Sequence, residues 1–169
     1  MSDVAAYSVR DGIAVITMNN PPVNGLGNAL RAGIAEALKK AAADPAATAV
    51  VFIGSSKVFS GGADITEFGK PPFPGMATLR DVLVYMDTVT KPIVAAIAGP
   101  TMGGGLELAL GAHYRCAITG AQIALPEVKL GILPGAGGTQ RLPRLIGAKT
   151  ALDMIVSGEP VSTERAHEL

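Results

Sequence analysis

Runs of apolar residues alternate with polar, glycine-rich connections along the chain, and their spacing indicates two kinds of element. Continuous β-rich apolar runs predict strands at residues 12–18, 49–53, 92–98 and 122–125. Apolar positions three and four residues apart predict helices at residues 30–43, 79–88, 106–112 and 143–157. Alternating strands and helices are typical of an α/β fold, so we expect the buried strands to be parallel or mixed.

Turn-forming residues mark the connections between these elements. Residues 19–27, NNPPVNGLG, predict a loop, and residues 55–68 predict a glycine-containing turn. The proline-rich segment 70–76 predicts a mobile surface loop. The last residues, VSTERAHEL, predict the start of a further helix, with Ser162 or Thr163 as its cap.

The composition is that of a globular chain with a buried core. Its 169 residues suffice for one domain, with 49% hydrophobic and 17% charged residues. Fourteen basic residues match fourteen acidic ones, so no charge excess attracts nucleic acid or an anionic membrane. We expect the domain to cover residues 1–169 and to be incomplete at its C-terminal end, because no cap follows the last predicted helix.

Several other classes are disfavoured by particular residues. The single Cys116 excludes an internal disulfide and is typical of a reducing compartment. Two histidines without metal-ligand spacing disfavour a zinc site, and His113 is expected to be an ordinary core or surface residue. The first 18 residues lack a signal-peptide pattern, so we expect a protein that is not secreted. The apolar run 92–114 contains Glu107, two prolines and five glycines, which indicates a buried strand, turn and helix rather than membrane insertion.

Nine of the 21 glycines lie in three clusters, at residues 61–62, 103–105 and 131–138. Glycine after a buried strand lets a ligand approach backbone N–H groups. If residues 103–105 open a helix, their N–H groups are unpaired donors at the positive end of its dipole. Such donors stabilise a phosphate or an oxyanion that forms during a reaction. Taken alone, the glycines are explained at least as well by close packing and turns, and no nucleotide-binding glycine motif is present.

Two glutamates lie in apolar surroundings. Glu107 lies within GLELAL, and Glu127 follows ALP. A buried carboxylate tends to have a raised pKa, which suits a general acid or base near neutral pH. The alternative for each glutamate is a place on the solvent side of an amphipathic turn. Arg115 and Arg141 are expected to anchor carboxylates or carbonyls structurally.

These clusters, in this order, resemble the enoyl-CoA hydratase/isomerase (crotonase) family. The similarity runs through nearly the whole chain and is carried by NPPVN (20–24), FSGGADI (59–65), AAIAGPTMGGGLELAL (95–110) and LPEVKLGILPGAGGTQRLPRLIG (125–147). It is strongest to the amino-terminal hydratase part of multifunctional fatty-acid β-oxidation enzymes. The resemblance implies a crotonase-like spiral of ββα units, truncated before the C-terminal helices that cover the acyl pocket, and therefore some exposed apolar surface.

The resemblance also implies roles for particular residues. The backbone N–H groups of Ala63 and Gly104 would form an oxyanion hole for a thioester enolate. Glu107 and Glu127 would together hold a water molecule. Glu107 would act mainly as its base while it adds to C3, and Glu127 would deliver or remove the C2 proton.

Three further positions follow from the same resemblance. Gly135 would lie near the water, and the backbone of Ala63, Asp64 and Ile65 would border the adenine end of CoA. CoA would be part of the substrate, so no separate cofactor is implied. NAD would enter only with a 3-hydroxyacyl-CoA dehydrogenase part that follows in a longer protein.

The implied reaction is the hydration of 2-trans-enoyl-CoA to 3-hydroxyacyl-CoA in fatty-acid β-oxidation. Two alternatives remain open: Δ3–Δ2-enoyl-CoA isomerisation or another crotonase-type reaction, and CoA-thioester binding without turnover. The expected partner is an acyl-CoA thioester, and the fragment is expected to be able to associate with itself. The implied location is the cytoplasm for a bacterial protein and the peroxisome for a eukaryotic one.

Overall fold

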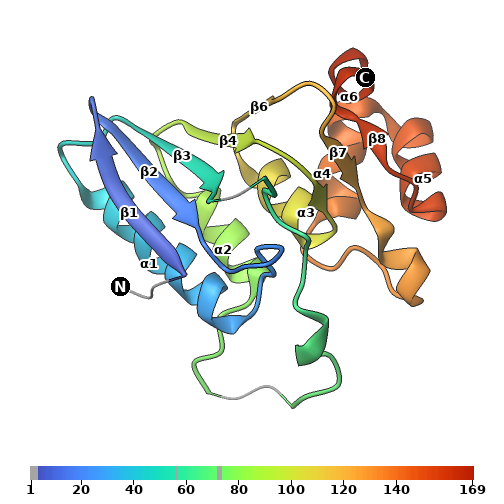
Figure 1. Ribbon diagram of the computed structural model, residues 1–169, viewed down its shortest axis with the longest axis horizontal. Helices are drawn as coiled ribbons and strands as arrows, with labels where there is room; N and C mark the ends of the chain where they lie inside the picture. Colours follow the sequence, from blue (N-terminus) through green and yellow to red (C-terminus); the bar gives the residue numbers. More distant parts are fainter. Residues whose placement is uncertain (1–3, 56, 72–73) are drawn as a thin grey trace.

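The computed structural model describes residues 4–55, 57–71 and 74–169, which form a mixed α/β fold with two sheets (Figure 1). One sheet has the strand order β1-β2-β3-β4-β6, and the other has the order β5-β7-β8. β1 pairs with β2 in antiparallel fashion, and the remaining pairs of the larger sheet are parallel. The strands are β1 (Ala5–Arg10), β2 (Ile13–Met18), β3 (Ala49–Gly54), β4 (Ile93–Ile97), β5 (Thr101–Met102), β6 (Tyr114–Ala117), β7 (Gln122–Ala124) and β8 (Val161–Ser162).

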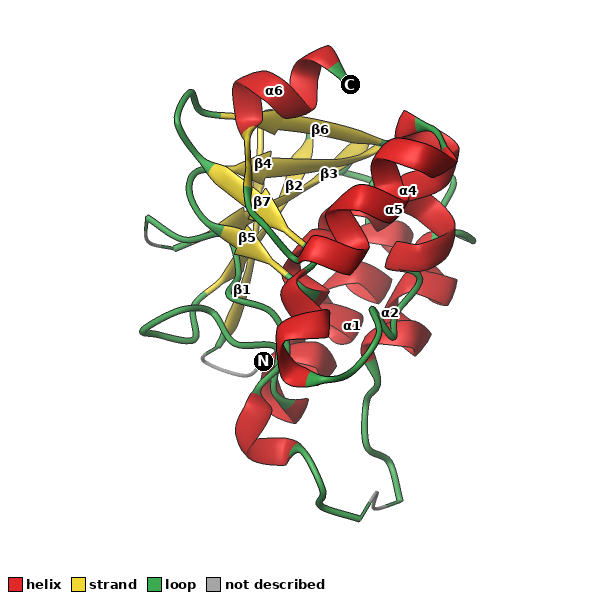
Figure 2. Ribbon diagram, turned by 90° about the vertical axis from the view of Figure 1, so that its right-hand side faces the viewer, coloured by secondary structure: helices red, strands yellow, loops and turns green. Residues whose placement is uncertain are grey.

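Helices cover one side of the larger sheet. In Figure 2, α1, α2, α4 and α5 lie together beside the strands, and α6 lies near the C-terminus. The helices are α1 (Asn28–Ala43), α2 (Leu79–Met86), α3 (Gly104–Gly111), α4 (Gly138–Ile146), α5 (Ala148–Ser157) and α6 (Thr163–Glu168). Two 3-10 turns, η1 (Ile65–Glu67) and η2 (Pro126–Leu130), follow strand-like segments.

The main core lies between the larger sheet and α1. Alternate residues of β2 are fully buried, and α1 buries Leu30, Ile34 and Leu38, which are four residues apart. Burying one such leucine or isoleucine contributes about 1.5–3 kcal/mol. A second, smaller cluster joins α3 to the C-terminal elements and includes Leu106, Leu110, Leu125, Leu142 and Met154.

The predicted strands and the first helices agree with the structure, but the C-terminal helix does not. Residues 143–157 were expected to form one helix, whereas two helices, α4 and α5, are separated at Gly147. Gly147 has a φ of 81°, a conformation that L side chains rarely adopt and that ends a helix. β1 and β6 were not predicted. Ser162 caps α6 by accepting a hydrogen bond from the Arg165 N–H. It is one of the two residues that the sequence offered as the cap, the other being Thr163.

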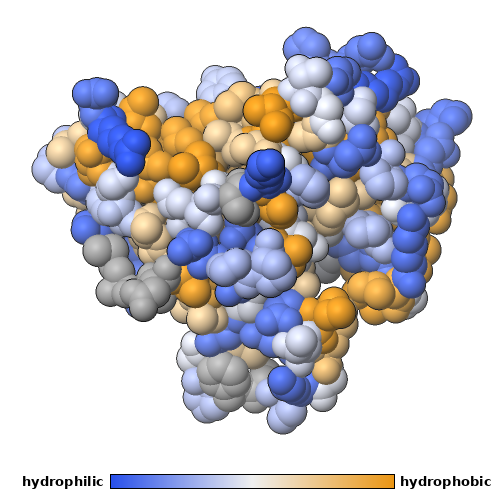
Figure 3. Space-filling view, viewed as in Figure 1, coloured by the Kyte–Doolittle hydropathy of each residue, from blue (hydrophilic) through white to orange (hydrophobic). Residues whose placement is uncertain are grey.

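The segment after Asp64, which carries η1, projects from the main body in Figure 1 and corresponds to the lower protrusion of the space-filling view in Figure 3. The proline-rich loop expected at 70–76 includes Pro72 and Phe73, which lie outside the described residues, as do residues 1–3 and 56. Apolar side chains are exposed at η2 and just after it, including Leu130, Ile132 and the 74% exposed Leu133. None of the helices in the described ranges has the length and apolar character needed to cross a bilayer.

Candidate active site

Parallel pairing of short strands brings three segments together. The Met102 N–H donates to the Ser60 carbonyl (2.9 Å), and the Gly103 N–H donates to the Ala124 carbonyl (2.9 Å). The segments that follow Ser60, Met102 and Ala124 therefore emerge at the same edge. These are the two glycines before Ala63, the start of α3, and η2. Ligand sites in α/β folds commonly form at such an edge.

The three glycines at the start of α3 serve three different purposes. Gly103 has a φ of 52°, and a Cβ there would lie 3.1 Å from Glu127 Oε1. A Cβ on Gly104 would lie 3.5 Å from the Ala63 nitrogen, so the two backbones lie close together. A Cβ on Gly105 would lie 2.6 Å from the Ser60 carbonyl oxygen, too close for any side chain. Close packing therefore explains Gly105, whereas Gly103 and Gly104 border the two candidate functional groups.

The N–H groups of Ala63 and Gly104 lie beside each other. Within the described part of the chain, neither donates a hydrogen bond. Gly104 is the first residue of α3, where N–H groups have no partner inside the helix. The positive φ of Gly62 (98°) allows the turn before Ala63 to approach Met102 and Gly104. Two adjacent amides without partners form a place where an anionic oxygen is stabilised.

Buried polar side chains hold the turn before Ala63. The Ser60 hydroxyl donates to the Asn24 carbonyl (2.8 Å) and accepts from the Gly62 N–H (3.1 Å). The Asn24 side-chain amide donates to the Val58 carbonyl (2.9 Å). Both side chains are almost fully buried, so this turn is held by satisfied hydrogen bonds rather than by apolar contacts.

Glu107 is buried in α3 and held by backbone amides. It is 3% exposed, which excludes the solvent-side alternative. Its Oε1 accepts hydrogen bonds from the Ala136 N–H (2.8 Å) and the Gly138 N–H (2.8 Å) at the start of α4. Burial raises the pKa of Glu107 above its ordinary range, and these N–H groups act in the opposite direction because they favour the carboxylate.

Glu127 is also buried, but it has fewer partners. It is 9% exposed, and its Oε2 accepts no hydrogen bond from any residue that the structure describes. Burial raises the pKa of Glu127, and the negative charge of Glu107 raises it further. A buried carboxyl oxygen without a partner is costly, and at such an edge it is typical of an atom that acts on a ligand.

The other expected site residues lie around this centre. Asp64 caps η1 by accepting from the Thr66 N–H (3.0 Å), and Ile65 is exposed beside it. Gly135 is exposed and immediately precedes Ala136, whose N–H binds Glu107. The roles of Asp64, Ile65 and Gly135 towards a ligand remain predictions.

Residues that the sequence reasoning treated as structural behave accordingly. Arg115 donates to the Ala109 and Ala112 carbonyls, and Arg141 forms a two-fold contact with Asp87. His113 is exposed, and its Nδ1 accepts from the Ile93 N–H (3.1 Å). The described residues contain no group of three His, Cys, Asp or Glu side chains able to hold a metal ion.

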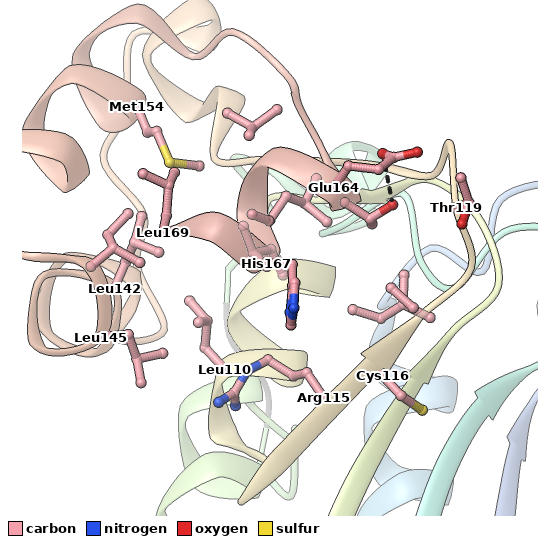
Figure 4. A pocket seen from close by; sticks show the side chains of 18 residues that line it. Leu110, Arg115, Cys116, Thr119, Leu142, Leu145, Met154, Glu164, His167 and Leu169 are labelled. Carbon is pink, nitrogen blue, oxygen red and sulfur yellow. Dashed lines mark hydrogen bonds between the residues drawn. The ribbon is translucent and has the colours of Figure 1, made fainter.

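A cavity among the described residues lies away from this centre. It has a volume of about 700 Å³ and lies between α3, β6 and the C-terminal helices. Figure 4 shows Leu110, Leu142 and Met154 around it, with Arg115 and His167 nearby. Neither glutamate is among its lining residues in the described structure. The candidate site is therefore located by its chemical groups and not by this cavity.

Some contacts of the site were missed by the sequence analysis. The glycine cluster at 131–138 was recognised, but only Gly135 was given a function. The amides that hold Glu107 belong instead to Ala136 and Gly138. The run GAGG, which places small residues before a helix, was the available signal. Arg31, which is buried beside the Ala63 segment, was given no role.

Comparison with known proteins identifies similar sequences. A family model described as enoyl-CoA hydratase/isomerase matches residues 8–169. The peroxisomal bifunctional enzyme of Danio rerio is 50% identical over 162 residues, which are 95% of this chain and 22% of that protein. A peroxisomal fatty acid beta-oxidation multifunctional protein of Arabidopsis thaliana is 44% identical over 166 residues, covering 95% of this chain and 23% of that protein. The chain thus spans less than a quarter of these relatives.

Solved structures agree with this similarity. DspI of Pseudomonas aeruginosa superposes with a TM-score of 0.90 at 34% identity, covering 98% of this chain and 70% of that one. An enoyl-CoA hydratase of Bacillus anthracis gives a TM-score of 0.90 at 31% identity, covering 98% of this chain and 67% of that one. The crotonase-like fold expected from the sequence is thereby confirmed.

Proposed function

Because this chain belongs to the enoyl-CoA hydratase/isomerase family, we propose that it hydrates 2-trans-enoyl-CoA to 3-hydroxyacyl-CoA, a step of fatty-acid β-oxidation. One observation carries the proposal: the buried Glu107 lies one turn after Gly104 in α3, the buried Glu127 borders Gly103, and the Ala63 and Gly104 N–H groups donate no hydrogen bond among the described residues. The relatives named for fatty-acid β-oxidation support the class of substrate.

The proposed mechanism assigns one task to each group. The thioester carbonyl oxygen accepts hydrogen bonds from the Ala63 and Gly104 N–H groups, which stabilise the negative charge of the enolate. Glu107, whose carboxylate form is favoured by the two amides that bind its Oε1, takes a proton from water as the water oxygen bonds to C3. Glu127, whose protonated form is favoured by burial and by the nearby charge of Glu107, gives its proton to C2. Exchange with solvent then returns a proton from Glu107 to Glu127.

Δ3–Δ2 isomerisation is a second candidate, favoured by the unpartnered Oε2 of Glu127. Such an atom is suited to remove the C2 proton of a bound Δ3-enoyl thioester, which forms a dienolate, and to return the proton to C4, which gives the Δ2 thioester. Isomerisation requires no water at C3, and therefore depends less on Glu107.

Hydration of crotonyl-CoA, followed by loss of the enoyl-thioester absorbance, tests the proposal. Glu107→Gln and Glu127→Gln should each lower kcat by about 10²–10⁴-fold. Glu36→Gln, at an exposed position of α1, is the matched control and should leave turnover unchanged. Tight crotonyl-CoA binding without turnover, in this chain and in a longer protein containing it, would refute hydration and favour the binding alternative.

The relatives' names bear on the longer protein. Since they are called bifunctional or multifunctional and this chain covers less than a quarter of them, we propose that a 3-hydroxyacyl-CoA dehydrogenase part accompanies it. Any NAD would then bind to that part. For a eukaryotic source, the same relatives support a peroxisomal location.

A further inference from the structure

A buried arginine on α1 contacts the segment that carries Ala63. Arg31 is only 9% exposed, which is unusual for an arginine. Its Nε donates to the Ala77 carbonyl (2.6 Å), and its Nη1 donates to the Leu26 carbonyl. Nη1 also forms an ion pair with Glu67 Oε2 at 2.9 Å. One guanidinium therefore joins α1 to η1 and to the segment before α2.

Glu67 completes this connection from the other side. Its Oε1 accepts a hydrogen bond from the Asn28 N–H (2.6 Å), at the first residue of α1. A carboxylate at a helix N-terminus is stabilised by the unpaired N–H groups there. The Asn28 side-chain oxygen accepts from the Ala77 N–H (3.0 Å), so both contacts converge on Ala77.

These contacts hold the Ala63 peptide at both of its ends. On one side, the Gly62 carbonyl accepts from the Leu26 N–H (2.8 Å), and the Leu26 carbonyl is bound by Arg31. On the other side, Ala63 is followed by Asp64 and η1, whose last residue, Glu67, is bound by Arg31. Arg31 therefore contacts the chain on both sides of the Ala63 peptide, in addition to the Ser60 and Asn24 hydrogen bonds that hold the turn before it.

The space around this connection is tight. A Cβ on Gly27 would lie 3.1 Å from Asp64 Oδ2 and 3.2 Å from Glu67 Oε1. The acidic side chains of η1 are thus packed directly against the start of α1. Such packing leaves η1 little room to shift while Arg31 remains bound.

We propose that Arg31 and Glu67 are positioning residues, which fix the direction of the Ala63 N–H and thereby the strength of the oxyanion site. This inference rests on the proposed function, because the direction of that N–H matters only when a thioester oxygen binds to it. Charge on this oxygen grows in the transition state, so a misplaced N–H lowers kcat more than it raises KM. A displacement of about 1 Å can cost about 10²-fold in rate.

Kinetics of crotonyl-CoA hydration test the positioning role. Arg31→Met should lower kcat by about tenfold to a hundredfold while KM changes much less. Arg31→Lys keeps a cation for Glu67 but lacks the guanidinium fork that binds two carbonyls, so it should recover part of the lost kcat. The matched control is Arg115→Met, which also removes an arginine bound to two backbone carbonyls.

A purely structural role predicts a different pattern. Arg31→Met and Arg115→Met would then both lower Tm, and kcat per folded molecule would be unchanged in both. That result would overturn the proposal. A lower kcat in Arg31→Met alone, with partial recovery in Arg31→Lys, would support it.

Amide hydrogen exchange supplies a readout that needs no turnover. The Leu26 and Glu67 N–H groups, bonded to the Gly62 and Asp64 carbonyls, should exchange faster in Arg31→Met than in the native chain. They should be unaffected in Arg115→Met. If the native chain does not hydrate crotonyl-CoA, the proposed function fails, but exchange still decides whether Arg31 fixes this segment. Unchanged exchange would overturn the proposal.

Discussion

Glu107 and Glu127 share one site but are held in opposite ways. Two backbone amides bind Glu107, whereas Oε2 of Glu127 has no partner among the described residues. Burial raises both pKa values, but the amides favour the charged form of Glu107. In turn, the negative charge of Glu107 favours the protonated form of Glu127. Under the proposed mechanism, the hydrogen-bond partners rather than burial distinguish the base, Glu107, from the acid, Glu127.

The largest expected effect separates the two carboxylates by chemistry. If Glu127 handles the C2 proton, Glu127→Gln should slow the exchange of the C2 hydrogens of butyryl-CoA with D2O by about 10²–10⁴-fold. Glu107→Gln should retain most of this exchange, because no water adds to a saturated thioester. NMR loss of the C2 proton signal measures the rate. Equal loss in both variants would show that the two carboxylates act only as a unit.

A methyl group beside each carboxylate gives the next largest effect. A Cβ on Gly138 would lie 3.1 Å from Glu107 Oε1, and Gly138 already has a helical backbone. Gly138→Ala should therefore lower kcat by about tenfold to a hundredfold through displacement of Glu107, with some loss of Tm because the methyl group also lies 3.0 Å from Pro134 Cβ and 3.1 Å from Leu125 Cδ1. Steady-state kinetics and a thermal melt measure both quantities. Unchanged kcat would mean that Glu107 tolerates movement.

Gly103→Ala makes the corresponding change at Glu127, but with a backbone cost. Its Cβ would lie 3.1 Å from Glu127 Oε1, and alanine rarely adopts a φ of 52°. We expect a similar fall in kcat together with a loss of about 1–3 kcal/mol in the free energy of unfolding. Denaturant unfolding measures this loss. If Gly103→Ala were as stable as the native chain, strain at Gly103 would be excluded.

The smallest effect is a pH dependence of stability. The pKa of Glu127 is raised above its ordinary value of 4.5 in the folded chain, so the folded state binds more protons above pH 4.5. The free energy of unfolding therefore falls as pH rises through the window between 4.5 and the raised pKa. The loss is about 1.4 kcal/mol for each unit of rise. Glu127→Gln removes this titration, so its Tm relative to the native chain should increase from pH 5 to pH 8.

The same comparison for Glu107 provides a contrast. Hydrogen bonds from Ala136 and Gly138 favour the carboxylate of Glu107, so the Tm of Glu107→Gln relative to the native chain should increase less as pH rises. The substitution should also leave these two N–H groups facing a side-chain amide. Parallel melts of both variants at several pH values measure the difference. If the Tm of both variants changed identically with pH, the two backbone hydrogen bonds to Glu107 would not distinguish it from Glu127.

The strands of the larger sheet and the helices that cover it were predictable where buried side chains recur at a regular spacing in the sequence. β3 and β4 are short apolar runs, and α1 shows a four-residue spacing of buried side chains. β6 lacks this signal, because Tyr114, Cys116 and Ala117 are exposed and its identity depends on pairing with β4. The end of α4 at Gly147 was predictable in principle, because glycine commonly follows the last residue of a helix. The apolar spacing continues across Gly147, however, and so predicted a single helix.

The candidate site was predictable in its residue types but not in its contacts. The apolar surroundings of Glu107 and Glu127 suggested burial but left a solvent-side position open for each, and both side chains are buried. Which of them receives amide hydrogen bonds depends on where α4 begins, about thirty residues after Glu107 in the chain. Likewise, the ion pair between Arg31 and Glu67 joins residues whose proximity depends on the fold of the intervening sheet.

The burial of α3 on all sides limits how this protein can change over time. All but the last of its residues are buried, and Gly105 has no room for a methyl group against the Ser60 carbonyl. Almost any substitution in α3 would move Glu107 or Gly104, so this helix can accept few mutations without loss of the site. A new substrate preference must therefore arise in the exposed segments, around η1 and after η2, where side chains can vary while α3 stays in place.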